Sequence, residues 1–196
     1  MCSSDLSVAP YEQALARVLE FADGAAVRRD GVRCYDLGGG FGIAYGQGDA
    51  LDVEAVAQAL MPQLRARGWA PVLEPGRFLV GDAGVLVTRV LGEKRQGGTD
   101  FVLVDAAMND LMRPALYQAE HAIVPVQAPK ATGAGAVVDV VGPVCETGDF
   151  LARKRALPPC GRGDLLAVLA AGAYGASMAS NYNTRRRPAE VLVGEI

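Results

Sequence analysis

A thiol and a carboxylate stand side by side in the segment VVDVVGPVCETGDF, residues 137–150. A free thiol has a pKa of about 8.5, so it is mostly protonated at neutral pH and can act as an acid. The β-branched run before Gly142 predicts a strand, in which neighbouring side chains point to opposite faces. Because Gly142 and Pro143 end that run, we expect Cys145 and Glu146 on a loop at the tip of the strand, where both can face one site.

Two glycine-containing segments are candidates for anion binding. The cluster GGG, residues 38–40, follows a predicted strand at 32–37 and lets backbone N–H groups approach a phosphate without a Cβ in the way. A tight structural turn explains the cluster equally well, since the spacing of a nucleotide-binding loop is absent. The segment EPGR, 74–77, ends a second predicted strand at 71–73, and Arg77 offers a bidentate partner for a carboxylate. A surface turn with an ion pair is the alternative there.

Arginine and tyrosine side chains form a third group of candidates. Arg113 and Tyr117 are four residues apart, which is one helical turn if Arg113 opens a helix. Tyr174 stands among small residues, where a planar ligand can lie close to the backbone, and a core tyrosine is an equal alternative. We interpret His121, the one histidine, as structural, because no acidic or nucleophilic partner stands out near it.

Alternating helices and strands must position the two anion-binding candidates. Apolar residues recur at helical spacing over 11–22, where Gly24 follows as a stop. They recur again over 53–64, with Asp52 as a candidate N-cap and Gly68 as a candidate residue beyond the helix end. The order helix, strand, helix, strand predicts parallel strands with crossover helices, and in such folds chemistry gathers at the carboxyl ends of the strands.

Past residue 82 the pattern changes to short β-rich runs separated by Gly and Pro, which predicts a separate all-β domain of the sandwich or barrel type. The expected strands are 85–91, 101–104, 136–141, 165–169 and 190–193. The predicted fold class is therefore α/β followed by all-β.

Composition excludes several classes of protein. A net charge of −3 with 21% charged residues leaves no concentrated basic face for nucleic acid, and we interpret the one basic run, 185–187, as solvated. No apolar run approaches the ~20 residues of a membrane span, and no signal-like segment opens the chain. The cysteines form no CxxC pair and few other metal ligands accompany them, so we expect no metal site and a reduced, cytoplasmic location.

The number of α/β repeats is too small for a closed barrel. Each parallel strand needs neighbours on both sides and a helix layer over both faces, so we expect the chain to begin in mid-domain. Residues 1–6, MCSSDL, read as foreign to the protein, because Cys-Ser-Ser-Asp-Leu is what one reading frame of a common sequencing adapter encodes.

The motifs taken together closely resemble the diaminopimelate decarboxylase family, over nearly everything after residue 8. The matching segments are DLGGGFGI (36–43), EPGR (74–77), VDAAMNDLMRPALY (104–117), DVVGPVCETGDF (139–150) and AGAYGASMASNYNTRRRPAEVLV (171–193). The resemblance implies a pyridoxal 5'-phosphate enzyme of the alanine-racemase-like barrel class. Residues 7–81 would then be the C-terminal part of a PLP-binding (β/α)8 barrel, and residues 82–196 a C-terminal β domain that completes the site across a homodimer interface.

The same resemblance implies a reaction and a role for each candidate residue. The reaction takes meso-2,6-diaminopimelate to L-lysine and carbon dioxide. Cys145 corresponds to the donor that returns a proton to the substrate carbon in the partner subunit's site, and Glu146 to the residue that holds the distal end of the substrate. The cofactor-binding positions are Gly38, Gly39, Gly40, Glu74, Pro75, Gly76, Arg77 and Tyr174, and the substrate-binding positions are Arg77, Arg113, Tyr117, Glu146 and Tyr174.

One departure from the family bears on activity. The family holds its cofactor as a Schiff base on a lysine of an early barrel strand, whereas Lys94, Lys130 and Lys154 all fall in the predicted β domain. We therefore expect this chain to be inactive alone. Two alternatives stay open: a related decarboxylase of ornithine, arginine or carboxynorspermidine, and a non-catalytic module that only dimerises.

Overall fold

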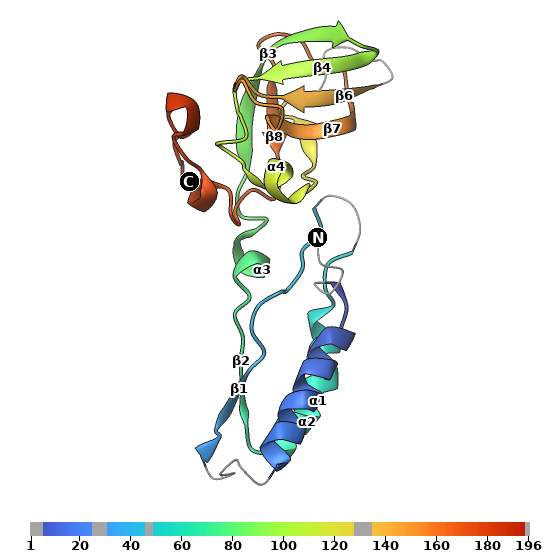
Figure 1. Ribbon diagram of the computed structural model, residues 1–196, viewed down its shortest axis with the longest axis vertical. Coiled ribbons are helices and arrows are strands. Elements are labelled where there is room, and N and C mark those ends of the chain that lie inside the picture. Colours follow the sequence, from blue (N-terminus) through green and yellow to red (C-terminus); the bar gives the residue numbers. More distant parts are fainter. Residues whose placement is uncertain (1–5, 25–30, 46–48, 128–134, 195–196) are drawn as a thin grey trace. The chain divides into compact units, whose positions relative to one another are not determined.

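The computed structural model describes residues 6–24, 31–45, 49–127 and 135–194 (Figure 1). Within these residues the chain divides into two compact units, the first holding 6–44 and 49–79 and the second holding Tyr45 and 80–194. The domain limits 7–81 and 82–196 stay a prediction. Residues 1–5 of the segment expected to be foreign lie outside the described residues.

The helices of the first unit confirm the helical spacing of the sequence. Helix α1, Ala9–Asp23, ends at Gly24, and helix α2, Val53–Ala66, begins at Asp52, whose side chain accepts the N–H of Ala55 at 2.9 Å. This cap satisfies one of the free N–H groups at the start of the helix. Gly68 follows α2 with a φ of +68°, the left-handed conformation that favours glycine beyond a helix end.

The strands of the first unit are short and parallel, as predicted. Strand β1, Cys34–Asp36, pairs with β2, Ala70–Val72, so that Tyr35 lies opposite Pro71. A core of buried residues from α1, α2 and the following loops packs beside them; its fully buried members include Leu15, Leu60 and Leu64. The described residues give two strands of the expected barrel, and a complete barrel stays a prediction.

The second unit is built on one six-stranded sheet in the order β5-β8-β3-β4-β6-β7. The strands are β3 (Leu86–Gln96), β4 (Thr99–Val104), β5 (Ile123–Pro125), β6 (Ala136–Val141), β7 (Phe150–Leu157) and β8 (Leu165–Val168). All neighbouring strands pair antiparallel except β4 and β6, which run parallel. Short helical segments accompany the sheet: α3 (Gly76–Val80), which begins in the first unit, α4 (Arg113–Tyr117), η3 (Ala176–Met178) and η4 (Tyr182–Thr184).

The sheet curls around a single apolar core. Every strand contributes to the same cluster of buried residues, including Ile123 from the edge strand β5 and Leu151 from the edge strand β7. In a flat sheet, strands five places apart would be separated by roughly 24 Å, because neighbours lie about 4.8 Å apart. A shared core therefore requires strong curvature, and the unit is a mostly β domain that approaches a closed barrel (Figure 1).

The structure overturns one expected strand and adds two that were not expected. The segment 190–193 forms no strand, and Val191, Leu192 and Val193 are 80%, 98% and 88% exposed. Strands β5 and β7 were not predicted, because β5 is only three residues long and β7, FLARKRAL, carries consecutive charges. In β7 a bulge at Lys154, which has a φ of +49° and donates its N–H to Asp139, breaks the alternation that marks a strand.

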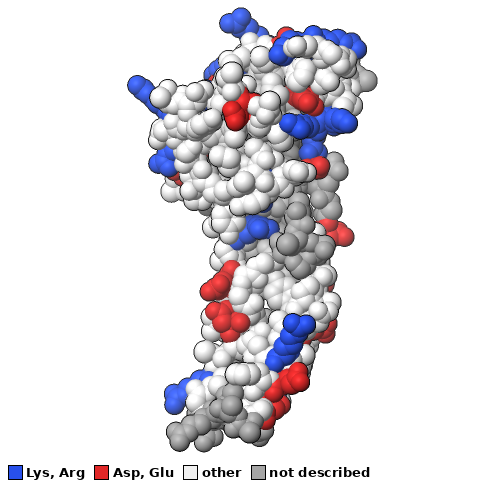
Figure 2. Space-filling view, in the orientation of Figure 1, with Lys and Arg blue, Asp and Glu red and all other residues white. Residues whose placement is uncertain are grey.

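Charge is dispersed over the face of the molecule drawn in Figure 2. On this face, acidic and basic side chains lie among uncharged ones without a broad patch of either sign. No helix in the described part of the chain is long and apolar enough to cross a membrane.

Candidate functional site

Cys145 and Glu146 lie on the loop between β6 and β7, which we call the Cys145 loop (residues 142–149). Both side chains are exposed, while Val144 beside them is buried. The loop follows the end of β6, as the sequence predicted. The two functional candidates are thus presented to the outside by a hairpin connection rather than enclosed in the core.

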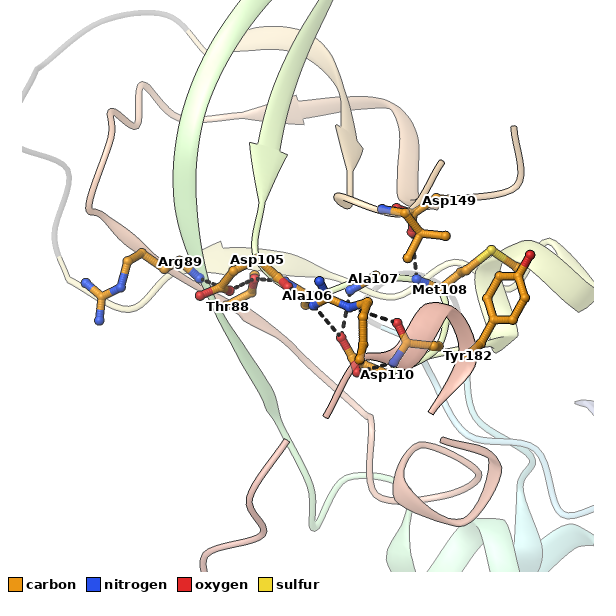
Figure 3. A network of polar contacts seen from close by, with 12 residues as sticks. Thr88, Arg89, Asp105, Ala106, Ala107, Met108, Asp110, Asp149 and Tyr182 are labelled. Carbon is orange, nitrogen blue, oxygen red and sulfur yellow. Dashed lines mark hydrogen bonds and ion pairs between the residues drawn. The ribbon is translucent and has the colours of Figure 1, made fainter. Parts of the chain in front are cut away.

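Asp149 fixes this loop from within. One carboxylate oxygen accepts the N–H of Val144 at 2.6 Å, and the other accepts the N–H of Met108 at 2.7 Å. The side chain is only 5% exposed. Gly142 is required in the loop, because a Cβ there would lie 2.6 Å from both oxygens of Asp149. The connection between Asp149 and Met108 is drawn in Figure 3.

The segment that Met108 belongs to, residues 105–113, leads from β4 into α4, and we call it the Arg113 turn. Asp110 is buried in it and accepts the N–H of Ala107 at 2.8 Å. Thr88 on β3 donates its hydroxyl to Asp105 at 2.7 Å (Figure 3). Burial raises the pKa of Asp110 above its usual range, although the Ala107 N–H and nearby Arg185 oppose that rise.

Arg185 reaches the Arg113 turn from the C-terminal segment. Its Nε donates to Asn109 Oδ1 at 3.1 Å, its Nη2 donates to the carbonyl of Asp105, and Nη2 lies 3.6 Å from Asp110. The backbone N–H of Ser180 donates to the Asn109 carbonyl at 2.9 Å. The interpretation of 185–187 as a solvated run was therefore wrong for Arg185, whose charge is used to secure the turn.

Arg113 opens helix α4, the condition under which Tyr117 lies one helical turn away, and is 5% exposed. Its guanidinium carbon lies 4.9 Å from the ring centroid of Tyr45, which groups with the second unit, and 5.9 Å from that of Tyr174. It also donates a hydrogen bond to the Tyr45 hydroxyl. Among the described residues, no carboxylate forms an ion pair with Arg113. The turn thus holds a buried cation between aromatic rings, and no described carboxylate compensates its charge.

Tyr117 and Tyr174 are both about half exposed, at 56% and 47%. The alternative of a core tyrosine at 174 is therefore wrong. Tyr174 has a φ of +62°, and it follows a close backbone approach at Gly172, where a Cβ would meet the Val80 carbonyl oxygen at 1.9 Å. The backbone there leaves its ring at the surface beside Arg113.

His121 is completely buried behind Arg113 and Tyr45. Its Nδ1 lies 2.9 Å from the Leu169 carbonyl oxygen, and its ring packs edge-on against Tyr45 at 5.0 Å. Burial lowers the pKa of His121, and the positive charge of Arg113 adds to that effect. A neutral, buried imidazole is in keeping with the structural interpretation.

The glycine cluster and the EPGR segment meet in the first unit, at the carboxyl ends of β1 and β2. Gly38 and Gly40 have φ values of +73° and +81°, which favour glycine. Glu74 donates its N–H to the Gly38 carbonyl at 2.9 Å, and a Cβ on Gly39 would lie 3.0 Å from the Glu74 carbonyl oxygen. In the described residues, the N–H groups of Gly39 and Gly40 have no hydrogen-bond acceptor.

The structure divides the candidates between the two units. The first unit holds the glycines with Glu74, Pro75, Gly76 and Arg77, the last two at the start of α3; the second holds Arg113, Tyr117, Tyr174, Cys145 and Glu146. Sequence reasoning missed Asp149, Asp110 and Arg185, which support the second group. The described residues contain no group of three or more metal-ligating side chains. Lys94 and Lys154 lie in the second unit, and Lys130 lies outside the described residues.

Comparison with known proteins gives a consistent result. Residues 11–172 match the pyridoxal-dependent decarboxylase family, in its C-terminal sheet domain. A diaminopimelate decarboxylase of Neisseria meningitidis is 52% identical over 190 residues, which are 97% of this chain and 46% of the relative. The chain therefore spans about half the length of the curated relatives it matches.

Solved structures show the same similarity. A crystal structure from Aquifex aeolicus has a TM-score of 0.86 and 42% identity, covering 96% of this chain and 46% of that one. The diaminopimelate decarboxylase of Helicobacter pylori, solved with L-lysine, has a TM-score of 0.81 and 36% identity, covering 93% and 45%.

Proposed function

Because the chain belongs to the pyridoxal-dependent decarboxylase family, we propose that the whole protein removes carbon dioxide from meso-2,6-diaminopimelate and releases L-lysine. The chain described above supplies part of the active site. Relatives of this activity match nearly all of the chain, and the H. pylori relative was solved with L-lysine, the product of the proposed reaction.

The observation that carries the proposal is the buried cation at Arg113. A charge removed from water is costly unless an anion compensates it, and no described carboxylate does so. The aromatic rings of Tyr45 and Tyr174 orient the guanidinium, which favours a bidentate contact with a planar anion. Diaminopimelate keeps one carboxylate after decarboxylation, and Arg113 binds that carboxylate, with Tyr117 one helical turn away.

The first unit fits the phosphate of the cofactor. The N–H groups of Gly39 and Gly40 are available to an anion, and the positive φ values of Gly38 and Gly40 favour residues without a Cβ, which would otherwise cover the backbone. These groups, together with the Glu74–Arg77 segment, would hold pyridoxal phosphate, with Tyr174 as a further contact. When bound, this cofactor withdraws the electron pair left by the departing carbon dioxide. The Schiff-base lysine is not in the described part of the first unit, so the chain alone does not hold the cofactor covalently.

Cys145 and Glu146 complete the site from the exposed loop. Cys145 donates the proton that replaces carbon dioxide on the substrate carbon, and Glu146 binds the distal ammonium group. Their exposure supports a role toward another subunit, so we assign them to the partner site of a homodimer. Arg113 and Cys145 of one chain then serve two different active sites.

The test uses a chimera in which the chain replaces the matching C-terminal part of the N. meningitidis relative. Lysine release from meso-diaminopimelate is measured with pyridoxal phosphate present, and ornithine and arginine are assayed in parallel. We expect lysine formation and no turnover of the other two. The N-terminal part of the relative expressed alone is the control. A chimera that decarboxylates ornithine or arginine but not diaminopimelate would contradict the proposal.

A further inference from the structure

Asp149 connects two segments that are far apart in the sequence and that both carry candidates for the reaction. Its two carboxylate oxygens each accept one backbone N–H, from Val144 in the Cys145 loop and from Met108 in the Arg113 turn. At 2.6 and 2.7 Å these are short bonds to an ionisable acceptor, and the side chain is nearly excluded from water. One side chain therefore determines where the two segments lie relative to each other.

The two segments depend on Asp149 to different degrees. The Arg113 turn has independent support from Asp110, Thr88 and Arg185. Apart from the bond to Asp149, the described residues give the Cys145 loop only local backbone bonds, such as Glu146 N–H to the Val144 carbonyl at 2.8 Å, and one long bond from Arg153 to the Thr147 carbonyl. Loss of Asp149 should release the loop while the turn keeps its shape.

Packing around the loop allows little compensation. A Cβ at Gly142 would clash with Asp149 and with the Ala106 carbonyl oxygen at 2.7 Å. A Cβ placed on Gly148 would lie 3.7 Å from the terminal methyl of Met108. The loop and the turn are therefore in direct contact, and the position of one is set by the other through Asp149.

We propose that Asp149 is a positioning residue that holds the Cys145 loop against the Arg113 turn of the same chain, so that the thiol is presented to the substrate carbon of the partner site from one face only. The inference rests on the proposed function, in which Cys145 is the proton donor. Asp149 itself touches neither substrate nor cofactor. Its effect is exerted through Val144, the residue before the thiol.

The first test uses this chain and needs no activity. Asp149→Asn keeps the shape of the side chain but leaves one oxygen acceptor where two N–H groups converge. Asp164→Asn is the matched control, because Asp164 also accepts a backbone N–H, from Gly161 at 2.8 Å, and lies outside both segments. We expect amide hydrogen exchange at Val144 to rise at least tenfold in the first variant and less than twofold in the second. Unchanged exchange at Val144 would overturn the inference.

The second test uses the chimera in deuterium oxide. The carbon that loses carbon dioxide becomes a CH2 group of lysine, and a donor fixed on one face places deuterium in one of its two prochiral positions. We expect a single position in the unmutated chimera and in Asp164→Asn. Asp149→Asn should give both positions, with kcat lowered about tenfold, since deuterons then arrive from either face. The position of the deuterium, unlike kcat, does not depend on how much of the protein is folded.

The outcomes separate the inference from the proposed function. An unmutated chimera that makes no lysine refutes the proposed function. Lysine formation with single-position labelling in Asp149→Asn refutes only the positioning role. Asp149→Glu is the second variant: it keeps the charge but displaces the oxygens, and we expect mixed labelling from it as well. If both variants lose their sheet structure by circular dichroism, Asp149 is needed for folding and the inference fails.

Discussion

Replacing Arg113 with methionine should separate binding from stability. The guanidinium loses two ring contacts, at about 0.5–1 kcal/mol each, and one hydrogen bond from a charged donor, at about 1.5–3 kcal/mol. Against this, removing a buried charge that has no described counter-ion recovers desolvation free energy of similar or larger size. We therefore expect the free energy of unfolding of Arg113→Met to stay within about 1 kcal/mol of the unmutated chain.

Arg185→Met is the matched comparison, because Arg185 donates to Asn109 and to the Asp105 carbonyl and lies near the buried Asp110. Hydrogen bonds from a charged donor are worth about 1.5–3 kcal/mol, and Asp110 would lose its nearby cation, so we expect a loss of about 3 kcal/mol. Urea unfolding of the chain, followed by circular dichroism, measures both variants. In the chimera, Arg113→Met should raise the KM for diaminopimelate by about tenfold or more. This is the change in affinity expected when one hydrogen bond between charged groups, worth about 1.5 kcal/mol or more, is lost.

Equal destabilisation by Arg113→Met and Arg185→Met would contradict this expectation. Such a result would mean that Arg113 already has an anionic partner within the fold. The binding site for a substrate carboxylate would then lose its main support, whatever the family of the protein.

Further predictions concern the cofactor, the thiol, a helix cap and pH. When the chain alone is incubated with pyridoxal phosphate and reduced with borohydride, mass spectrometry should find no covalently attached cofactor. The chain alone should also form no lysine from diaminopimelate. Stoichiometric labelling of one of its lysines would contradict the expected lack of a Schiff-base site. Cys145→Ala in the chimera should lose most turnover but keep cofactor absorbance, and near-normal turnover would remove the thiol from the mechanism. Asp52→Ala should cost about 1 kcal/mol in urea unfolding, since α2 loses its N-cap, with Asp49→Ala as the control. Because the pKa of His121 is lowered in the folded chain, the unfolded chain binds a proton at this side chain more readily. The stability that the neutral imidazole contributes is therefore intact above the unfolded pKa of about 6.5 and is lost as pH falls toward the folded pKa. His121→Gln should make the free energy of unfolding depend less on pH in that range.

Features set by local interactions were predictable from the sequence. Strand β6 has the limits expected from its β-branched run, and α2 begins at the predicted cap. Arg113 opens a helix because Pro114 suits the first turn, where its missing N–H costs nothing. The loop position of Cys145 followed from the Gly-Pro pair that ends β6.

Features that depend on partners distant in the chain were not predictable. Residues 190–193 have high β propensity, but a strand also needs a neighbour to pair with, and the described residues offer none. The burial of Asp149 and the contacts of Arg185 depend on tertiary packing, which brings residues 41–80 positions apart into contact. No spacing rule in a single sequence predicts which of these distant residues come into contact.

The parallel pairing of β4 with β6 has a consequence for the order of folding. Strands β3 and β4 form a hairpin around Gly97 and Gly98, and β6 and β7 form a second one, so each can assemble from neighbouring residues. Joining β4 to β6 instead closes a loop of roughly 30 residues, a slower step with a larger entropic cost. Arg113 follows the first hairpin and Cys145 lies at the tip of the second. We therefore expect their relative placement to be acquired late in folding, and a chain arrested before that step should retain both hairpins without the contact between the Cys145 loop and the Arg113 turn.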